Sequence, residues 1–159
     1  MPGVTESQGE IKKAFENGMK ELSPGPTAIL IVVSPLRFTD KGNKFFQDLQ
    51  NLFTHESFLH FAILVMVRRN ELTTGNDGDL MDIKYFMETM ASPELQNLYK
   101  QCGKRIVAVE NLCSTSKKQE YASEVFAAID KLGGGYFSNT YLEISSLRKQ
   151  VEKRTCDIS

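Results

Sequence analysis

Two arginines and a carboxylate follow directly on an apolar run in the segment FAILVMVRRNEL, residues 61–72. A continuous apolar run rich in β-branched residues predicts a buried strand, so Arg68, Arg69 and Glu71 are expected at its carboxyl end. Ligands of open α/β sheets bind at the carboxyl ends of the strands, where the loops are held on a rigid scaffold. The segment therefore indicates a ligand site, and the alternative is that these charges are simply solvated at a strand end.

Three apolar runs predict the strands that position this site: AILIVV at 28–33, FAILVMV at 61–67 and RIVAV at 105–109. Their unbroken apolar character predicts burial on both faces, which requires helices on both sides of the sheet. The strand, helix, strand order implies parallel pairing and a three-layer α/β sandwich. The apolar faces expected on helices are Ile11, Ala14, Phe15, Met19 and Leu22, then Phe45, Phe46, Leu49, Leu52 and Phe53, then Leu80, Ile83, Phe86, Met87 and Met90, then Leu95, Leu98 and Tyr99, then Tyr121, Val125, Ile129 and Leu132, and finally Tyr141, Ile144, Leu147 and Val151.

Two helix ends carry local signals. Ser92 before Pro93 predicts an N-cap followed by proline at the first helical position. The run GGG at 133–135 predicts the end of the preceding helix, because glycine tolerates the left-handed conformation of a C-cap.

Composition bounds the class of protein. The 159 residues are 41% hydrophobic, and 19 basic against 20 acidic residues give a formal net charge of -1, so we expect one soluble cytoplasmic domain without an electrostatic preference for nucleic acid. We find no apolar run of the roughly 20 residues that a membrane span needs, and no signal peptide. The three cysteines, Cys102, Cys113 and Cys156, lack metal-ligand spacing and are expected to be reduced and structural, with His55 and His60 structural as well.

Four segments together resemble one known family. LSPGPTAILIVVSPLRFTDKGNKFF at 22–46 is similar to the SPGPHA, apolar strand, GRFT box of the GTPases of immunity-associated proteins. In the same order, RRNEL at 68–72 lies where that family carries its guanine-specificity motif, LYKQCGKRIVAVEN at 98–111 resembles its CGGR-x-x-AFNN stretch, and GGGYFSNTYLE at 133–143 resembles its NGG-x-x-YTN-x-Y segment. The resemblance covers nearly the whole chain.

The resemblance implies a Ras-like P-loop GTPase fold, with residues 1–132 as the C-terminal portion of the G domain and 133–159 as a C-terminal helical extension. It also implies binding of GTP or GDP with Mg²⁺, slow hydrolysis, and dimerisation with itself or with family members. No GxxxxGK[ST] phosphate loop occurs in the chain. Pro2 and Gly3 match the last two residues of the family's DTPG motif, so we expect them to be a remnant of the phosphate and switch region, with the first strands and the phosphate loop upstream. The chain is then a truncated gene product, a fragment of a longer protein, or a degenerate relative.

The resemblance assigns roles to five residues. Glu71 takes the place of the aspartate that accepts hydrogen bonds from guanine, and a carboxylate suits this edge because two acceptors face two donors. Arg69 replaces a lysine whose stem packs along the base, and Arg68 is a second candidate for stacking. Glu110 and Asn111 take the places of the family's paired asparagines, so Asn111 is retained and is expected to contact the base edge or brace the loop, whereas Glu110 puts a negative charge near the site. The alternative for Asn111 is an ordinary turn residue.

The GRFT match adds Arg37, Phe38 and Thr39, which we expect at the end of the strand at 28–33, where they shape the site or a dimer surface. The alternatives are packing for Phe38 and a helix cap for Thr39. Two functions from different classes remain: a guanine-nucleotide-binding protein, and a non-catalytic interaction module that pairs through an uncovered strand edge.

Overall fold

The computed structural model describes residues 8–22, 25–38, 42–44, 46–48, 56–75 and 77–135, together with residues 151, 153 and 154. Within these residues three strands form one parallel sheet in the order β1–β2–β5. The register pairs Ile31 with Leu64 and Leu64 with Ile106. The three predicted strands are therefore confirmed, with bounds β1 (Ile29–Val33), β2 (Ala62–Met66) and β5 (Ile106–Ala108).

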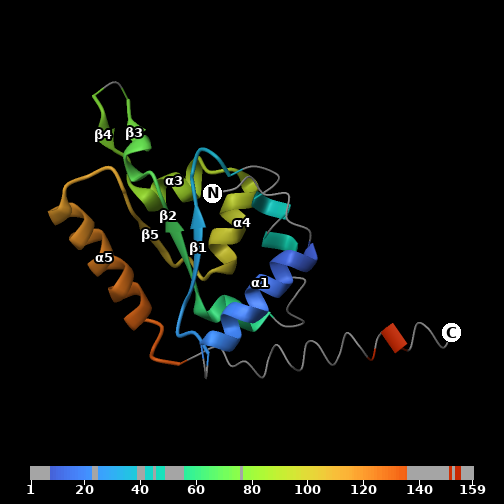
Figure 1. Cartoon of the computed structure of the whole chain (residues 1–159). Coiled ribbons are helices and arrows are strands. Elements are labelled where there is room, and N and C mark those ends of the chain that lie inside the picture. Colours follow the sequence, from blue (N-terminus) through green and yellow to red (C-terminus); the bar gives the residue numbers. More distant parts are fainter. Residues whose placement is uncertain are drawn as a thin grey trace.

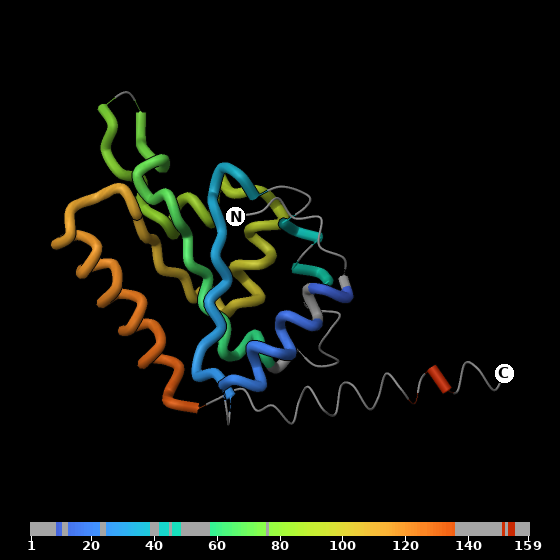
Figure 2. The backbone as a smooth tube through the Cα atoms, in the orientation of Figure 1, coloured from blue at the N-terminus to red at the C-terminus, as the bar shows by residue number. Residues whose placement is uncertain are grey.

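Helices flank this sheet on both sides (Figure 1). Helix α5 lies on one side, and α1 and α4 lie on the other, so the predicted three-layer α/β arrangement is confirmed. The smooth tube of Figure 2 follows the same path from α1 through the sheet to α5. The bounds are α1 (Gln8–Glu21), α3 (Ile83–Thr89), α4 (Pro93–Gln101) and α5 (Thr115–Asp130), with two 3-10 helices, η1 (Glu56–Phe61) and η2 (Arg69–Glu71).

The core lies between the sheet and the layer that contains α1, α3 and α4. Strand β2 is buried at all five positions, as expected for a central strand covered on both faces. Leu64 from β2, Met19 from α1, and Leu95 and Leu98 from α4 belong to one buried cluster. Because buried apolar area is the main favourable term in folding, this layer carries most of the stability of the described part.

The prediction that β1 is buried on both faces is wrong. Leu30 and Val32 are 44% and 58% exposed, whereas Val33 is buried. Leu30 and Val32 alternate with the residues that face the core, so they lie on the opposite face of the sheet. Helix α5 packs against β5, and β1 is an outer strand of the described sheet, which leaves this part of the face open.

The apolar stripe from Leu80 to Met90 is not one helical face. A two-stranded antiparallel hairpin, β3 (Thr73–Thr74) and β4 (Asp79–Leu80), precedes α3, and both Leu80 and Met90 are exposed. Gly75 and Gly78 adopt positive φ angles of 55° and 72° in the connecting turn, a conformation that glycine reaches without strain. Ala14 on α1 and Leu22, the residue after α1, also belong to a predicted buried face, and both are exposed.

The predicted start of α4 is confirmed, whereas α5 ends before the glycine run, with Lys131 as its C-cap in the right-handed conformation. The Ser92 side chain accepts a hydrogen bond from the Leu95 amide at 3.3 Å, which caps α4. Gly133 and Gly134 follow α5 with φ angles of 88° and 78°. The expected helix at 141–151 lies outside the described residues apart from Val151, so the division of the chain between 132 and 133 stays a prediction.

Candidate functional site

The loops that follow β2 and β5 lie side by side at the carboxyl end of the sheet. We call residues 67–72 the β2 loop and residues 109–114 the β5 loop. The Val109 amide donates to the Met66 carbonyl at 2.8 Å, and the Arg69 amide donates to the Val109 carbonyl at 3.1 Å. The parallel ladder thus continues past the ends of both strands, and it holds the two loops in register.

A left-handed residue turns the chain from β2 into η2. Arg68 has φ 59° and ψ 46°, and the Glu71 amide donates to the Arg68 carbonyl at 3.0 Å. The Arg68 guanidinium also donates to the Glu71 carboxylate at 3.0 Å, with the two side chains 45% and 34% exposed. The turn therefore presents the Glu71 carboxylate at the surface, paired with a cation of its own loop.

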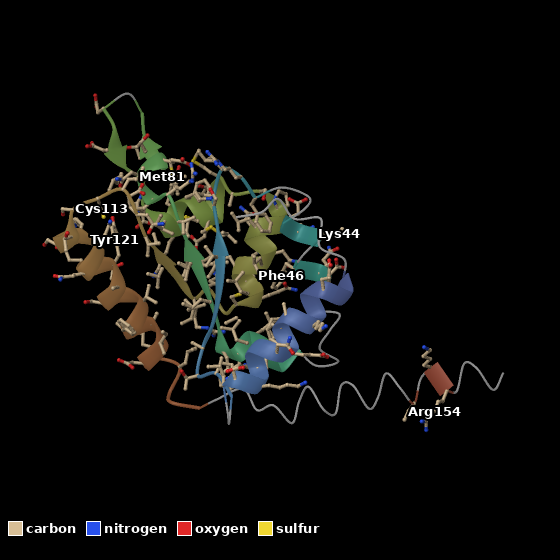
Figure 3. The ribbon with its side chains drawn as sticks, viewed as in Figure 1. Lys44, Phe46, Met81, Cys113, Tyr121 and Arg154 are labelled. Atoms are coloured by element: carbon tan, nitrogen blue, oxygen red, sulfur yellow. The ribbon has the colours of Figure 1, made fainter. Side chains whose placement is uncertain are left out.

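The side chain of Arg69 is held by backbone carbonyl groups. Its guanidinium donates to the carbonyl of Leu72 at 3.3 Å and to the carbonyl of Met81, at the base of the β3–β4 hairpin. It also lines a groove of about 570 Å³ formed with β5, the start of α3 and α5, which Glu71 does not line. Figure 3 labels Met81, at the base of the hairpin, and Tyr121 on α5, which lines the groove. The guanidinium of Arg69 is thus bonded to backbone carbonyls, whereas the carboxylate of Glu71 pairs with Arg68.

Glu110 is the one buried charged residue among those described, at 7% exposure. Its Oε1 accepts a hydrogen bond from the Asn70 amide at 3.1 Å, and its Oε2 accepts one from the Leu112 amide at 3.3 Å. The Cys113 thiol donates to the Glu110 carbonyl at 3.0 Å. Each carboxylate oxygen therefore serves a different loop, and the side chain joins the β2 loop to the β5 loop.

The remaining predicted residues fall in three groups. Asn111 is exposed on the β5 loop, next to the residues that Glu110 holds. Arg37 is exposed, and Phe38 is partly buried against the core, which is the packing role considered for it. Pro2, Gly3 and Thr39 lie outside the described residues.

Cysteine and acidic side chains give no second chemical site in the described part of the chain. No group of three or more His, Cys, Asp or Glu side chains there is placed to hold a metal ion. Burial raises the pKa of the Cys102 thiol to about 11, against the opposing charge of Arg105, so this thiol is inert at neutral pH. No described helix is both long and apolar enough to cross a membrane.

Comparison with known proteins gives the family of this fold. Residues 2–157 match the AIG1 family. The chain belongs to the AIG1 family. This AIG1-family chain is also 24% identical over 157 residues to the human protein GTPase IMAP family member 8, an alignment that covers 96% of the chain and 23% of that protein. The parallel sheet with helices on both faces is accordingly a portion of the Ras-like P-loop GTPase fold.

Sequence analysis did not find two features of the candidate site in this AIG1-family chain. Leu112 is 89% exposed beside Asn111, and no local pattern marks an exposed leucine as part of a site. The bridging role of Glu110 depends on an amide 40 residues earlier in the chain. The available signal was an acidic residue directly after a predicted strand, which shows a strand end but not the partner of the side chain.

Proposed function

We propose that this chain binds guanine nucleotides and that the β2 and β5 loops supply the base-recognition end of the site. Membership of the AIG1 family supports the proposal, and so does the name of its human relative, which describes a GTPase. The observation that carries it is the exposed Glu71 carboxylate, which a left-handed turn presents at the end of a central parallel strand. Ligand sites of open α/β sheets lie at this end.

Glu71 discriminates guanine from adenine by the number of acceptors it offers. The ring N–H and the exocyclic amine of guanine are adjacent donors, and a carboxylate presents two acceptor oxygens to them. Arg68 shares one oxygen of Glu71 at 3.0 Å, and that oxygen retains a further lone pair for the base. Asn111, with one donor and one acceptor group, lies on the neighbouring loop, where we expect it to contact the base edge or brace the loop.

The phosphates and Mg²⁺ of a nucleotide need groups that these residues do not supply. The chain contains no GxxxxGK[ST] sequence, and the described residues hold no cluster suited to a metal ion. Phosphate contacts contribute much of nucleotide affinity because many N–H groups and a cation meet the charge. We therefore expect this chain alone to bind the base end weakly, with negligible hydrolysis.

The test is a titration of the whole chain with GMP, GDP and AMP up to millimolar concentrations, in which amide NMR signals report binding. We expect GMP to bind at least about fivefold more tightly than AMP, which is about 1 kcal/mol, and Glu71→Ala to abolish the difference. Glu120→Ala, which removes an exposed carboxylate on α5, is the matched control and should leave the preference intact. Equal binding of GMP and AMP by the unaltered chain would contradict the proposal.

The open face of β1 favours a second candidate, a non-catalytic interaction module. Leu30 and Val32 are exposed on an apolar strand that has a neighbour on only one side within the described sheet. Such an edge is a template for a further strand, from a second copy or from a complete relative. Sedimentation velocity should then show a concentration-dependent dimer that Val32→Lys removes and Leu36→Lys, in the exposed turn after β1, leaves unchanged. A monomer at all concentrations would exclude self-pairing.

A further inference from the structure

One buried carboxylate joins the two loops of the candidate site. Glu110 is 7% exposed, and it accepts from the Asn70 amide with one oxygen and from the Leu112 amide with the other. No Lys, Arg or His nitrogen lies within 4.0 Å of this carboxylate among the described residues. Among these residues, backbone amides of two different loops, and no cation, therefore meet the negative charge.

The chemistry of the bridge requires a group that only accepts. Both partners are backbone N–H donors, so a carboxylate can satisfy them simultaneously with its two oxygens. An amide side chain at the same position has one oxygen and one NH₂, and it would place a donor against one of the two amides. Hydrogen bonds to a charged acceptor are also stronger than neutral ones, and leaving a buried partner unsatisfied is costly.

We infer that Glu110 is a positioning residue that latches the β2 loop to the β5 loop and so fixes Glu71 and Asn111 relative to each other before a ligand arrives. The inference rests on the proposed binding of the guanine base at these loops. Asn70 adjoins Glu71 in the chain, and Leu112 adjoins Asn111, so each latch bond holds the backbone next to one base-recognition residue. Preorganisation of this kind raises affinity by removing the cost of ordering loops on binding.

A second hydrogen bond between the same loops distinguishes the latch from general loop packing. The Arg69 amide donates to the Val109 carbonyl at 3.1 Å, a contact between the same loops that does not involve a side chain. Its hydrogen-exchange rate therefore reports whether the loops have separated. The amides of Asn70 and Leu112 report the latch itself.

The experiment compares the whole chain with Glu110→Gln, Glu110→Asp and the control Glu120→Gln. Amide hydrogen exchange is measured without ligand, and affinities for GMP and AMP are measured by titration. In Glu110→Gln we expect the Asn70 or the Leu112 amide to exchange about tenfold faster, which is about 1.4 kcal/mol, with the Arg69 amide unchanged. We expect GMP affinity to fall several-fold in the same variant and to recover in part in Glu110→Asp, which keeps two acceptors.

The outcomes separate the latch from the proposed function. Unprotected Asn70 and Leu112 amides in the unaltered chain would overturn the latch, whatever binds. Protected amides with no preference for GMP in the unaltered chain would overturn the proposed function and, with it, the positioning role. Undiminished GMP affinity in Glu110→Gln, alongside a preference that Glu71→Ala abolishes, would overturn the positioning role alone.

Discussion

Replacing Arg68 by glycine and, separately, by alanine tests the turn that presents Glu71. Arg68 has φ 59° and ψ 46°, in the left-handed region where a residue with a Cβ atom carries a cost of roughly 1–2 kcal/mol. Glycine relieves this cost, but it raises the conformational entropy of the unfolded chain, which lowers stability by about 0.4–1 kcal/mol relative to alanine. Arg68→Gly should therefore be more stable than Arg68→Ala by roughly 1 kcal/mol.

Both variants also lose the pair between Arg68 and Glu71. The side chains are 45% and 34% exposed, and exposed pairs contribute about 0–1 kcal/mol because solvent screens them and two long side chains are ordered. Arg68→Ala should thus fall below the unaltered chain by no more than about 1 kcal/mol. Arg68→Gly should lie near the unaltered chain, since relief of the turn offsets the lost pair.

Urea denaturation measures these differences if the slope m stays constant across the variants. With m of about 2 kcal/mol/M, a difference of 1 kcal/mol separates the midpoints by about 0.5 M. Lys104 has φ 58° outside the candidate site and gives a matched control, in which Lys104→Gly should again be more stable than Lys104→Ala. The expected order at Lys104 combined with the reverse order at Arg68 would refute the left-handed turn before Glu71.

Three further predictions concern the scaffold. Leu98→Ala should cost about 2–5 kcal/mol in urea denaturation because the side chain is 1% exposed in the core, and a change below 1 kcal/mol would contradict the packing of α4 on the sheet. Ser92→Ala should cost about 1 kcal/mol through the lost cap of α4, whereas Ser92→Asp should keep most of the stability. Burial raises the pKa of Cys102 from 9.0 to about 11, so the unfolded chain ionises first and stability should fall between pH 9 and 11 by about 2–3 kcal/mol; Cys102→Ala should remove that part of the pH dependence.

The strands could be predicted from the sequence because short, unbroken apolar runs rich in β-branched residues are typical of buried strands. The five residues of β2 are buried on both faces, as the run FAILVMV indicates. The same pattern gave a wrong prediction of burial for β1, where Leu30 and Val32 are exposed. An apolar run shows that a strand can be buried, whereas actual burial depends on what packs against it.

The hairpin before α3 could not be predicted from apolar spacing. Leu80 and Ile83 fit a helical stripe, but Gly75 and Gly78 turn the chain back on itself with positive φ angles. Local glycine conformation decided the element here, and the helical pattern began only at α3.

The position of the candidate site could be predicted, because the residues that follow parallel strands meet at one end of the sheet. The directions of its side chains could not. Arg69 donates to a carbonyl 12 residues further along the chain, and Glu110 accepts from an amide 40 residues earlier. Such partners are set by the folded arrangement of the loops, so motif position placed Arg69 and Glu110 at the candidate site but did not give their contacts.

We propose that guanine is recognised at the paired loops after β2 and β5. The most direct measurement is the set of amide chemical-shift changes over the whole chain on addition of GMP, compared with addition of AMP. We expect GMP to shift the amides of Glu71, Asn111 and Leu112 and AMP to shift them far less. Shifts confined to other surfaces, or identical shifts with GMP and AMP, would contradict it.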